Sequence, residues 1–156
     1  MRRKAGPVEA FDEELRRLVP AMLQTMYAEP GVGLAAPQVG VSLRLMVMDV
    51  VPEGKNKPMV FINPKIEETR GRISSQEGCL SFPGITVTIP RAEWVRVSAL
   101  NEKGLPISVS GDGLLARCLQ HEIDHLDGVL MTDRLPLPQR LKTFWEIRRR
   151  KKAGLW

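Results

Sequence analysis

The sequence predicts an α+β fold in which a mainly antiparallel sheet lies between helices. Apolar residues recur at helical spacing near both ends of the chain, whereas the middle contains short alternating or wholly apolar runs. The chain has 156 residues, of which 43% are apolar and only 5% aromatic. That length and composition can bury one core, so residues 1–156 are expected to form a single domain.

The first helix is expected to start after Asp12, a residue type that caps helix N-termini well. Pro20 should kink this helix, because proline lacks the amide N–H. The glycines of EPGVGLAAPQVG, residues 29–40, should end it and open a loop. The apolar positions that define the helix are Leu15, Leu18, Val19, Met22, Leu23 and Met26.

Strands are expected from residue 43 to residue 111. LRLMVMDV (43–50) is apolar on both faces, which predicts a buried strand. EWVRVSALN (93–101) alternates apolar and polar residues, as in a half-buried strand. The other expected strands are MVFINP (59–64), KIEETRGR (65–72), GITVTIP (84–90) and GLPISVSG (104–111).

Two helices are expected after these strands. Asp112 can cap a helix that runs to about Leu126 and is closed by Gly128. A basic C-terminal helix should follow over about 138–152. Its apolar face is expected to pack on the domain through Leu141, Phe144 and Trp145, while Arg148, Arg149, Arg150, Lys151 and Lys152 project charge beyond it.

The positive charge of the chain belongs to this last segment. Residues 138–156 carry seven Lys or Arg against Glu146 alone, while the rest of the chain is nearly balanced. No signal peptide or membrane span is recognisable, so a soluble, cytoplasmic protein is expected. In that compartment Cys79 and Cys118 are expected to be thiols or metal ligands rather than a disulfide.

Both histidines lie in one short segment, QHEIDHLDG at residues 120–128. Positions i and i+4 of a helix share a face, so His121 and His125 can bind one cation together. Glu122 can reach a water molecule bound to that cation. The H-E-x-x-H pattern therefore predicts metal chemistry and raises the question of the third ligand.

The third ligand must be a carboxylate or a cysteine. Cys118 shares the histidine stripe, but a straight helix separates it from His125 by roughly 10 Å along the axis, and one helix cannot supply ligands from different directions. Cys79 follows a glycine that favours a tight bend presenting the thiol. A site of Cys79, His121 and His125 with one position open for water is the better interpretation. The alternative is a zinc endopeptidase with Glu146 as third ligand.

Three segments together resemble the signature motifs of the bacterial peptide deformylases. They are GVGLAAPQVG (31–40), EGCLS (77–81) and QHEIDHLDG (120–128), and they occur in that order. The resemblance covers almost the whole chain. It implies antiparallel sheets around a central helix that carries the histidines, and removal of the N-terminal formyl group from formyl-methionyl nascent polypeptides, with release of formate.

The resemblance also implies roles for individual residues. Glu122 would take a proton from the attacking water and pass it to the amide nitrogen as formate leaves. The oxyanion would be held by the cation, by the side-chain amide of Gln38 and by the backbone N–H of Leu80. Glu77 would orient a ligand or nearby backbone.

Substrate binding is expected beside the cation. Gly31 and Gly33 permit close backbone approach, so a peptide can pair strand-like with Val32 and Gly33. An apolar pocket for methionine is expected from Val32, Leu80, Leu115 and Cys118, and Gly78 is also expected in the substrate site.

The cofactor and partners follow from the same resemblance. It implies one divalent cation, Fe²⁺ in the cell, with Zn²⁺, Ni²⁺ or Co²⁺ as possible substitutes. N-formylmethionyl peptides would be the substrates, and the basic C-terminal helix would approach the ribosome. No membrane is expected as a partner. A nucleic-acid-binding module would explain the basic end but would leave the three motifs unexplained.

Overall fold

The computed structural model describes residues 2–29, 31–51 and 56–155. Its helices are α1 (Glu13–Ala28), α2 (Gly113–Leu126) and α3 (Leu137–Lys152), with short 3-10 helices η1 (Ala36–Val39) and η2 (Met131–Arg134). Its strands are β1 (Gly33–Ala35), β2 (Leu45–Met48), β3 (Met59–Arg70), β4 (Ile73–Gly78), β5 (Thr86–Arg91), β6 (Trp94–Leu100) and β7 (Pro106–Gly111).

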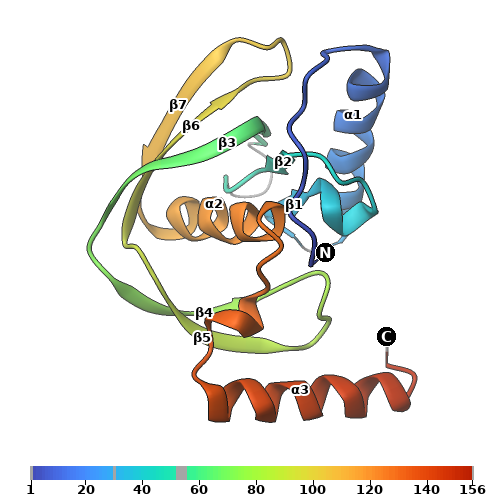
Figure 1. The fold of residues 1–156 in the computed structure, drawn as a ribbon, viewed down its shortest axis with the longest axis vertical. Coiled ribbons are helices and arrows are strands. Elements are labelled where there is room, and N and C mark those ends of the chain that lie inside the picture. Colours follow the sequence, from blue (N-terminus) through green and yellow to red (C-terminus); the bar gives the residue numbers. More distant parts are fainter. Residues whose placement is uncertain (1, 30, 52–55, 156) are drawn as a thin grey trace.

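The strands form two antiparallel sheets, as the sequence predicted. One has the order β1-β2-β3-β6-β7, and the other is the β4–β5 hairpin. Figure 1 shows α2 enclosed by the bent strands β3 and β6 and by the β4–β5 hairpin, with α3 along the far side of that hairpin. The α+β arrangement around a central histidine-bearing helix is confirmed.

Strand boundaries differ from the expectations in three places. The two runs at 59–64 and 65–72 form the single strand β3, whose pairing with β6 shifts register between Ile62 and Lys65. Asn63 has φ +52 there, and Pro64 lacks an amide donor. Strand β4 was not anticipated, because ISSQEG has one apolar residue, and β1 was hidden in the glycine-rich loop.

Helix α2 forms the centre of one apolar cluster, and helix α1 packs on a second. Ala116, Leu119, Ile123 and Leu126 of α2 are buried against residues of the large sheet such as Phe61. Helix α1 starts as predicted, with the Asp12 carboxylate accepting a hydrogen bond from the Leu15 N–H at 3.1 Å. It continues through Pro20 to Ala28.

The packing predicted for the C-terminal helix is wrong. Leu141, Phe144 and Trp145 are 52%, 53% and 64% exposed, so they do not hold α3 on the domain. Ile147 packs against the third apolar cluster, which includes residues of β5 and η2. Sequence periodicity identifies an apolar stripe on a helix but does not show which face of that helix turns toward the domain. No helix in the described ranges is both long and apolar enough to cross a bilayer.

Gly128, directly after α2, is a position where a side chain should be costly. Its φ is +74, and a Cβ added there would lie 2.7 Å from the carbonyl oxygen of Arg2. We expect Gly128→Ala to lower the free energy of unfolding by roughly 3 kcal/mol, combining the left-handed backbone with a backbone clash. Urea unfolding of the metal-loaded protein measures this as a lower midpoint with an unchanged slope.

Gly104 provides the matched control. Its φ is +76, but a Cβ there would meet only the Phe11 ring at 3.5 Å, an ordinary contact. Gly104→Ala should therefore cost about 1 kcal/mol, the backbone contribution alone. Equal costs for the two variants would contradict the packing of the N-terminal segment against Gly128.

Candidate metal centre and active site

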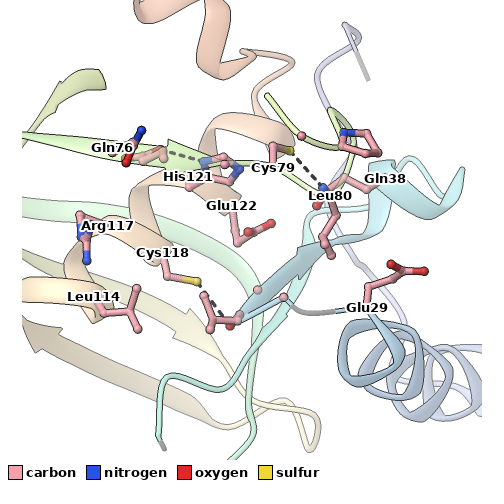
Figure 2. Close-up of a pocket in the computed structure, with 17 residues that line it drawn as sticks. Glu29, Gln38, Gln76, Cys79, Leu80, Leu114, Arg117, Cys118, His121 and Glu122 are labelled. Carbon is pink, nitrogen blue, oxygen red and sulfur yellow. Dashed lines mark hydrogen bonds and ion pairs between the residues drawn. The ribbon is translucent and has the colours of Figure 1, made fainter. Parts of the chain in front are cut away.

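Three metal-ligating side chains meet where α2 passes the end of β4. His121 and His125 lie one turn apart on α2, and Cys79 directly follows β4. The Cys79 Sγ and the His121 Nε2 each lie 3.2 Å from the His125 Nε2. All three donor atoms lie within 4.8 Å of one another. Figure 2 shows two of these residues, Cys79 and His121.

This donor set fits a divalent cation. Tetrahedral ligands with bonds of about 2.0–2.3 Å stand roughly 3.3–3.7 Å apart, close to the observed spacing. One thiolate and two imidazoles suit zinc and other first-row metals. Burial lowers the pKa of His125 to about 3, so its ring is neutral near pH 7. Burial also lowers the pKa of His121, but hydrogen bonds with Cys79 and Glu77 raise it to about 10, so a cation would displace that proton.

The other two candidate ligands lie elsewhere. The Cys118 thiol donates to the carbonyl oxygen of Val32 at 3.6 Å, and burial raises its pKa well above the usual value. Glu146 is on α3 and is ion-paired with Arg149 and Arg150, at 2.9 Å in each case. Neither residue therefore belongs to the cluster of donors around His125.

A buried chain of charges holds His121 in place. Its Nδ1 lies 2.9 Å from the Glu77 Oε2, which leaves Nε2 facing the other donors. Arg91 bonds both oxygens of Glu77 and also Asp124 of α2. Burial would raise the pKa of the Glu77 carboxyl, but the hydrogen bonds from His121 and Arg91 lower it to about 2. Glu77 is therefore a permanent anion at this position.

Glu122 is buried beside the cluster and has an oxygen free for chemistry. Its Oε2 makes no hydrogen bond to any described residue, although the side chain is only 4% exposed. Burial raises the pKa of this carboxyl to about 7. In Figure 2 the side chain points into the cavity between Cys118 and Leu80. An unpartnered buried carboxylate is costly, so it indicates a place for a polar ligand.

Gln38 approaches the cluster from η1. Its Oε1 accepts the Ala35 N–H at 2.8 Å, which directs its Nε2 toward Ser81 Oγ at 3.1 Å and Cys79 Sγ at 3.7 Å. The proline and glycine of the APQVG segment set this short helix, which ends at Gly40 with φ +84. A side-chain N–H donor is thus fixed beside the cysteine.

A cavity of about 460 Å³ opens beside these groups. The structure brings most of the sequence-predicted site residues to its wall, but it places Leu114 there rather than Leu115. Leu115 packs toward the core and Gly111, because one residue along a helix turns the side chain by about 100°. The predicted residues on the wall are Val32, Gly33, Gln38, Glu77, Gly78, Cys79, Leu80, Cys118, His121 and Glu122.

Two residues of the site were missed by the sequence reasoning, Arg91 and Asp124. A signal for Arg91 was present, because it continues the inward-facing alternation of Val87 and Ile89 along β5. A charged residue at an inward position predicts a buried partner. Asp124 lay within the H-E-x-x-H segment, but only the tertiary structure pairs it with Arg91.

Comparisons with known proteins agree with this geometry. A family model for polypeptide deformylase matches residues 1–141. A peptide deformylase of Alkalilimnicola ehrlichii is 50% identical over 135 residues, covering 86% of this chain and 76% of that protein. One from Neisseria meningitidis is 48% identical over 148 residues, covering 95% and 88%. The crystal structure of a peptide deformylase from Legionella pneumophila matches with a TM-score of 0.92 at 47% identity, covering 99% and 90%. The chain therefore belongs to the polypeptide deformylase family.

Proposed function

We propose that residues 1–156 act as a single catalytic domain that removes the formyl group from formyl-methionyl nascent polypeptides in the cytoplasm. The observation that carries this proposal is the meeting of Cys79, His121 and His125 beside the unpartnered carboxylate of Glu122. Family membership supports the same reaction, in which water adds to the formyl carbon, the C–N bond breaks and formate leaves.

Cys79, His121 and His125 would hold the cation, which we infer to be Fe²⁺ in the cell, with Zn²⁺, Ni²⁺ or Co²⁺ able to replace it. When bound, it would supply Lewis acidity that lowers the pKa of a water ligand toward about 7 and polarises the formyl carbonyl. The Glu122 carboxylate takes the proton of the attacking water and delivers it to the amide nitrogen. The Gln38 amide and the Leu80 N–H would donate to the oxyanion.

The substrate backbone is proposed to pair with β1. This strand lies at the edge of the large sheet and pairs only with β2 among the described strands, so a further strand can add on its other side. A Cβ at Gly33 would lie 2.6 Å from the Cys118 Sγ and 2.7 Å from the Glu122 Oε1, so glycine lets the backbone lie close to the catalytic carboxylate. Val32, Leu80 and Cys118, together with Leu114, offer the apolar wall for the methionine side chain.

The direct test is formate release from formyl-Met-Ala-Ser. The protein is purified under reducing, oxygen-free conditions and loaded separately with iron, nickel, cobalt or zinc. Activity with at least one cation is expected. The absence of formate with all four would reject the deformylase function.

Replacing Glu122 with Gln should separate chemistry from metal binding. The amide keeps the shape of the side chain but cannot accept the proton of the water, so kcat should fall about 10²- to 10⁴-fold. Metal content, measured by inductively coupled plasma mass spectrometry, should stay at one ion per chain. A variant that loses its metal would show that Glu122 has a structural role instead.

The two cysteines provide a matched pair for the choice of ligand. Cys79→Ala should lose stoichiometric metal because one of three protein ligands is gone, whereas Cys118→Ser should retain it. Glu146→Ala is the third arm and should also retain the metal. Metal loss in Glu146→Ala with retention in Cys79→Ala would instead support the endopeptidase alternative.

We propose further that the end of α3 brings the enzyme to the ribosome. Support comes from its basic last turn and from Leu137, Leu141, Phe144 and Trp145, which are exposed along the helix. Basic side chains that contact RNA phosphates release counterions, so such binding should weaken steeply with salt.

Removing residues 151–156 tests this docking while leaving Ile147 and Arg150 in place. Cosedimentation with ribosomes at low salt should weaken, and the slope of log affinity against log salt should decrease by about one for each lost phosphate contact. Turnover of formyl-Met-Ala-Ser should not change. Equal sedimentation of the two forms would refute the role of the last two lysines.

A further inference from the structure

A second groove, between β5 and α3, adjoins the active-site cavity at Gly84. Gly84 lines both hollows, so a chain that leaves the cavity past this residue enters the groove. The groove has a volume of about 820 Å³. Thr86 and Thr88 of β5 form one wall and residues of α3 form the other. Figure 1 shows α3 running along the β4–β5 hairpin.

Arg150 stands at the junction of the two hollows. Its guanidinium lies against the Gly84 backbone, so that a Cβ built on Gly84 would be 2.5 Å from Nη1 and 3.5 Å from Cζ. The Nε of Arg150 donates to the Glu146 Oε1 at 2.9 Å, which fixes the side chain. Within the described part of the chain, Nη1 and Nη2 have no hydrogen-bond acceptor. A positioned guanidinium whose two terminal NH₂ groups can donate therefore faces the path out of the cavity.

The α3 wall of the groove is positively charged. Lys142, Arg149 and Arg150 line it together with a single carboxylate, Glu146. Both arginines pair with Glu146, which is therefore already neutralised. The fork of a guanidinium matches the two oxygens of a carboxylate. The charge and the geometry of this wall favour acidic side chains.

We propose that this groove is a subsite for acidic residues of the nascent peptide downstream of the formyl-methionine, and that Arg150 selects them. The proposal rests on the proposed deformylase function, because the formyl group must occupy the cavity while the downstream chain occupies the groove. Six residues of a peptide in extended conformation span roughly 20 Å. The acidic residues that Arg150 selects therefore lie further along the peptide than the residues that contact the cavity.

The test compares long peptides that differ only in a distal charge. Each begins with formyl-Met-Ala-Ser, continues with a Gly/Ser spacer and carries either Asp-Asp or Asn-Asn, placed from about the fourth to about the tenth residue. The readout is the ratio of kcat/KM for the acidic peptide to that for its neutral partner. This ratio is measured for the wild type, for Arg150→Gln and for Arg148→Gln, which removes the same charge from a residue outside the groove lining.

We expect the wild-type ratio to peak at about 5 for one spacer length, the size of a partly exposed charge-assisted contact. Arg150→Gln should reduce the ratio to about 1, and Arg148→Gln should keep the wild-type value. A wild-type ratio of 1 at every spacer length would overturn the proposal. Equal losses in the two variants would also overturn it, because they would indicate general attraction to the basic helix.

Binding without turnover separates the groove from the reaction. Unformylated acidic and neutral peptides with a fluorescent label are titrated against the metal-loaded protein, and anisotropy gives their affinities. Tighter binding of the acidic peptide that is lost in Arg150→Gln supports the subsite even if no formate is released. Equal affinity of the two peptides in the wild type would count against it, whatever the assay of formyl-Met-Ala-Ser shows.

Discussion

The site depends on one buried ion pair, between Arg91 on β5 and Glu77 on β4. Both side chains are almost fully buried, and Asp124 of α2 completes the set. Buried charges are tolerated only when they are paired, and removal of one partner typically costs about 3–5 kcal/mol. Through its second pair, with Asp124, Arg91 ties the small hairpin to the central helix. Because Glu77 also bonds His121, the same cluster of charges orients a candidate metal ligand.

The rest of the site follows from this junction. Cys79 comes two residues after Glu77, so fixing β4 against α2 delivers the thiol to the histidines. The large sheet curves around α2 and buries its other faces, which leaves Glu122 facing the cavity rather than water. Burial then raises the pKa of Glu122 to about 7, so its carboxyl can both accept and donate a proton near neutral pH. Rigid elements thus carry the candidate catalytic groups, and the short η1 helix adds Gln38.

The C-terminal helix has residues that lie against the hairpin and an apolar stripe that is exposed. Ile147 and Arg150 lie toward the hairpin, against the third apolar cluster and Gly84 respectively. Leu141, Phe144 and Trp145 are exposed, and Trp145 also lines the groove between β5 and α3. An exposed apolar stripe beside a basic last turn is unusual for a free surface and favours an external partner. The helix therefore borders the rim of the active-site cavity at Gly84 and also presents exposed apolar and basic side chains.

The sequence by itself determined the antiparallel α+β class, the histidine pair and the carboxylate between them, and it favoured Cys79 over Cys118 as the candidate third ligand. Each of these depends on local spacing along one helix or on short motifs. Only the tertiary structure decided the pairing of Arg91 with Glu77 and Asp124, the wall position of Leu114 instead of Leu115, the strand β4 and the outward rotation of α3. These features depend on which distant segments pack together and on how each helix is rotated about its axis, and periodicity within a segment does not encode either property.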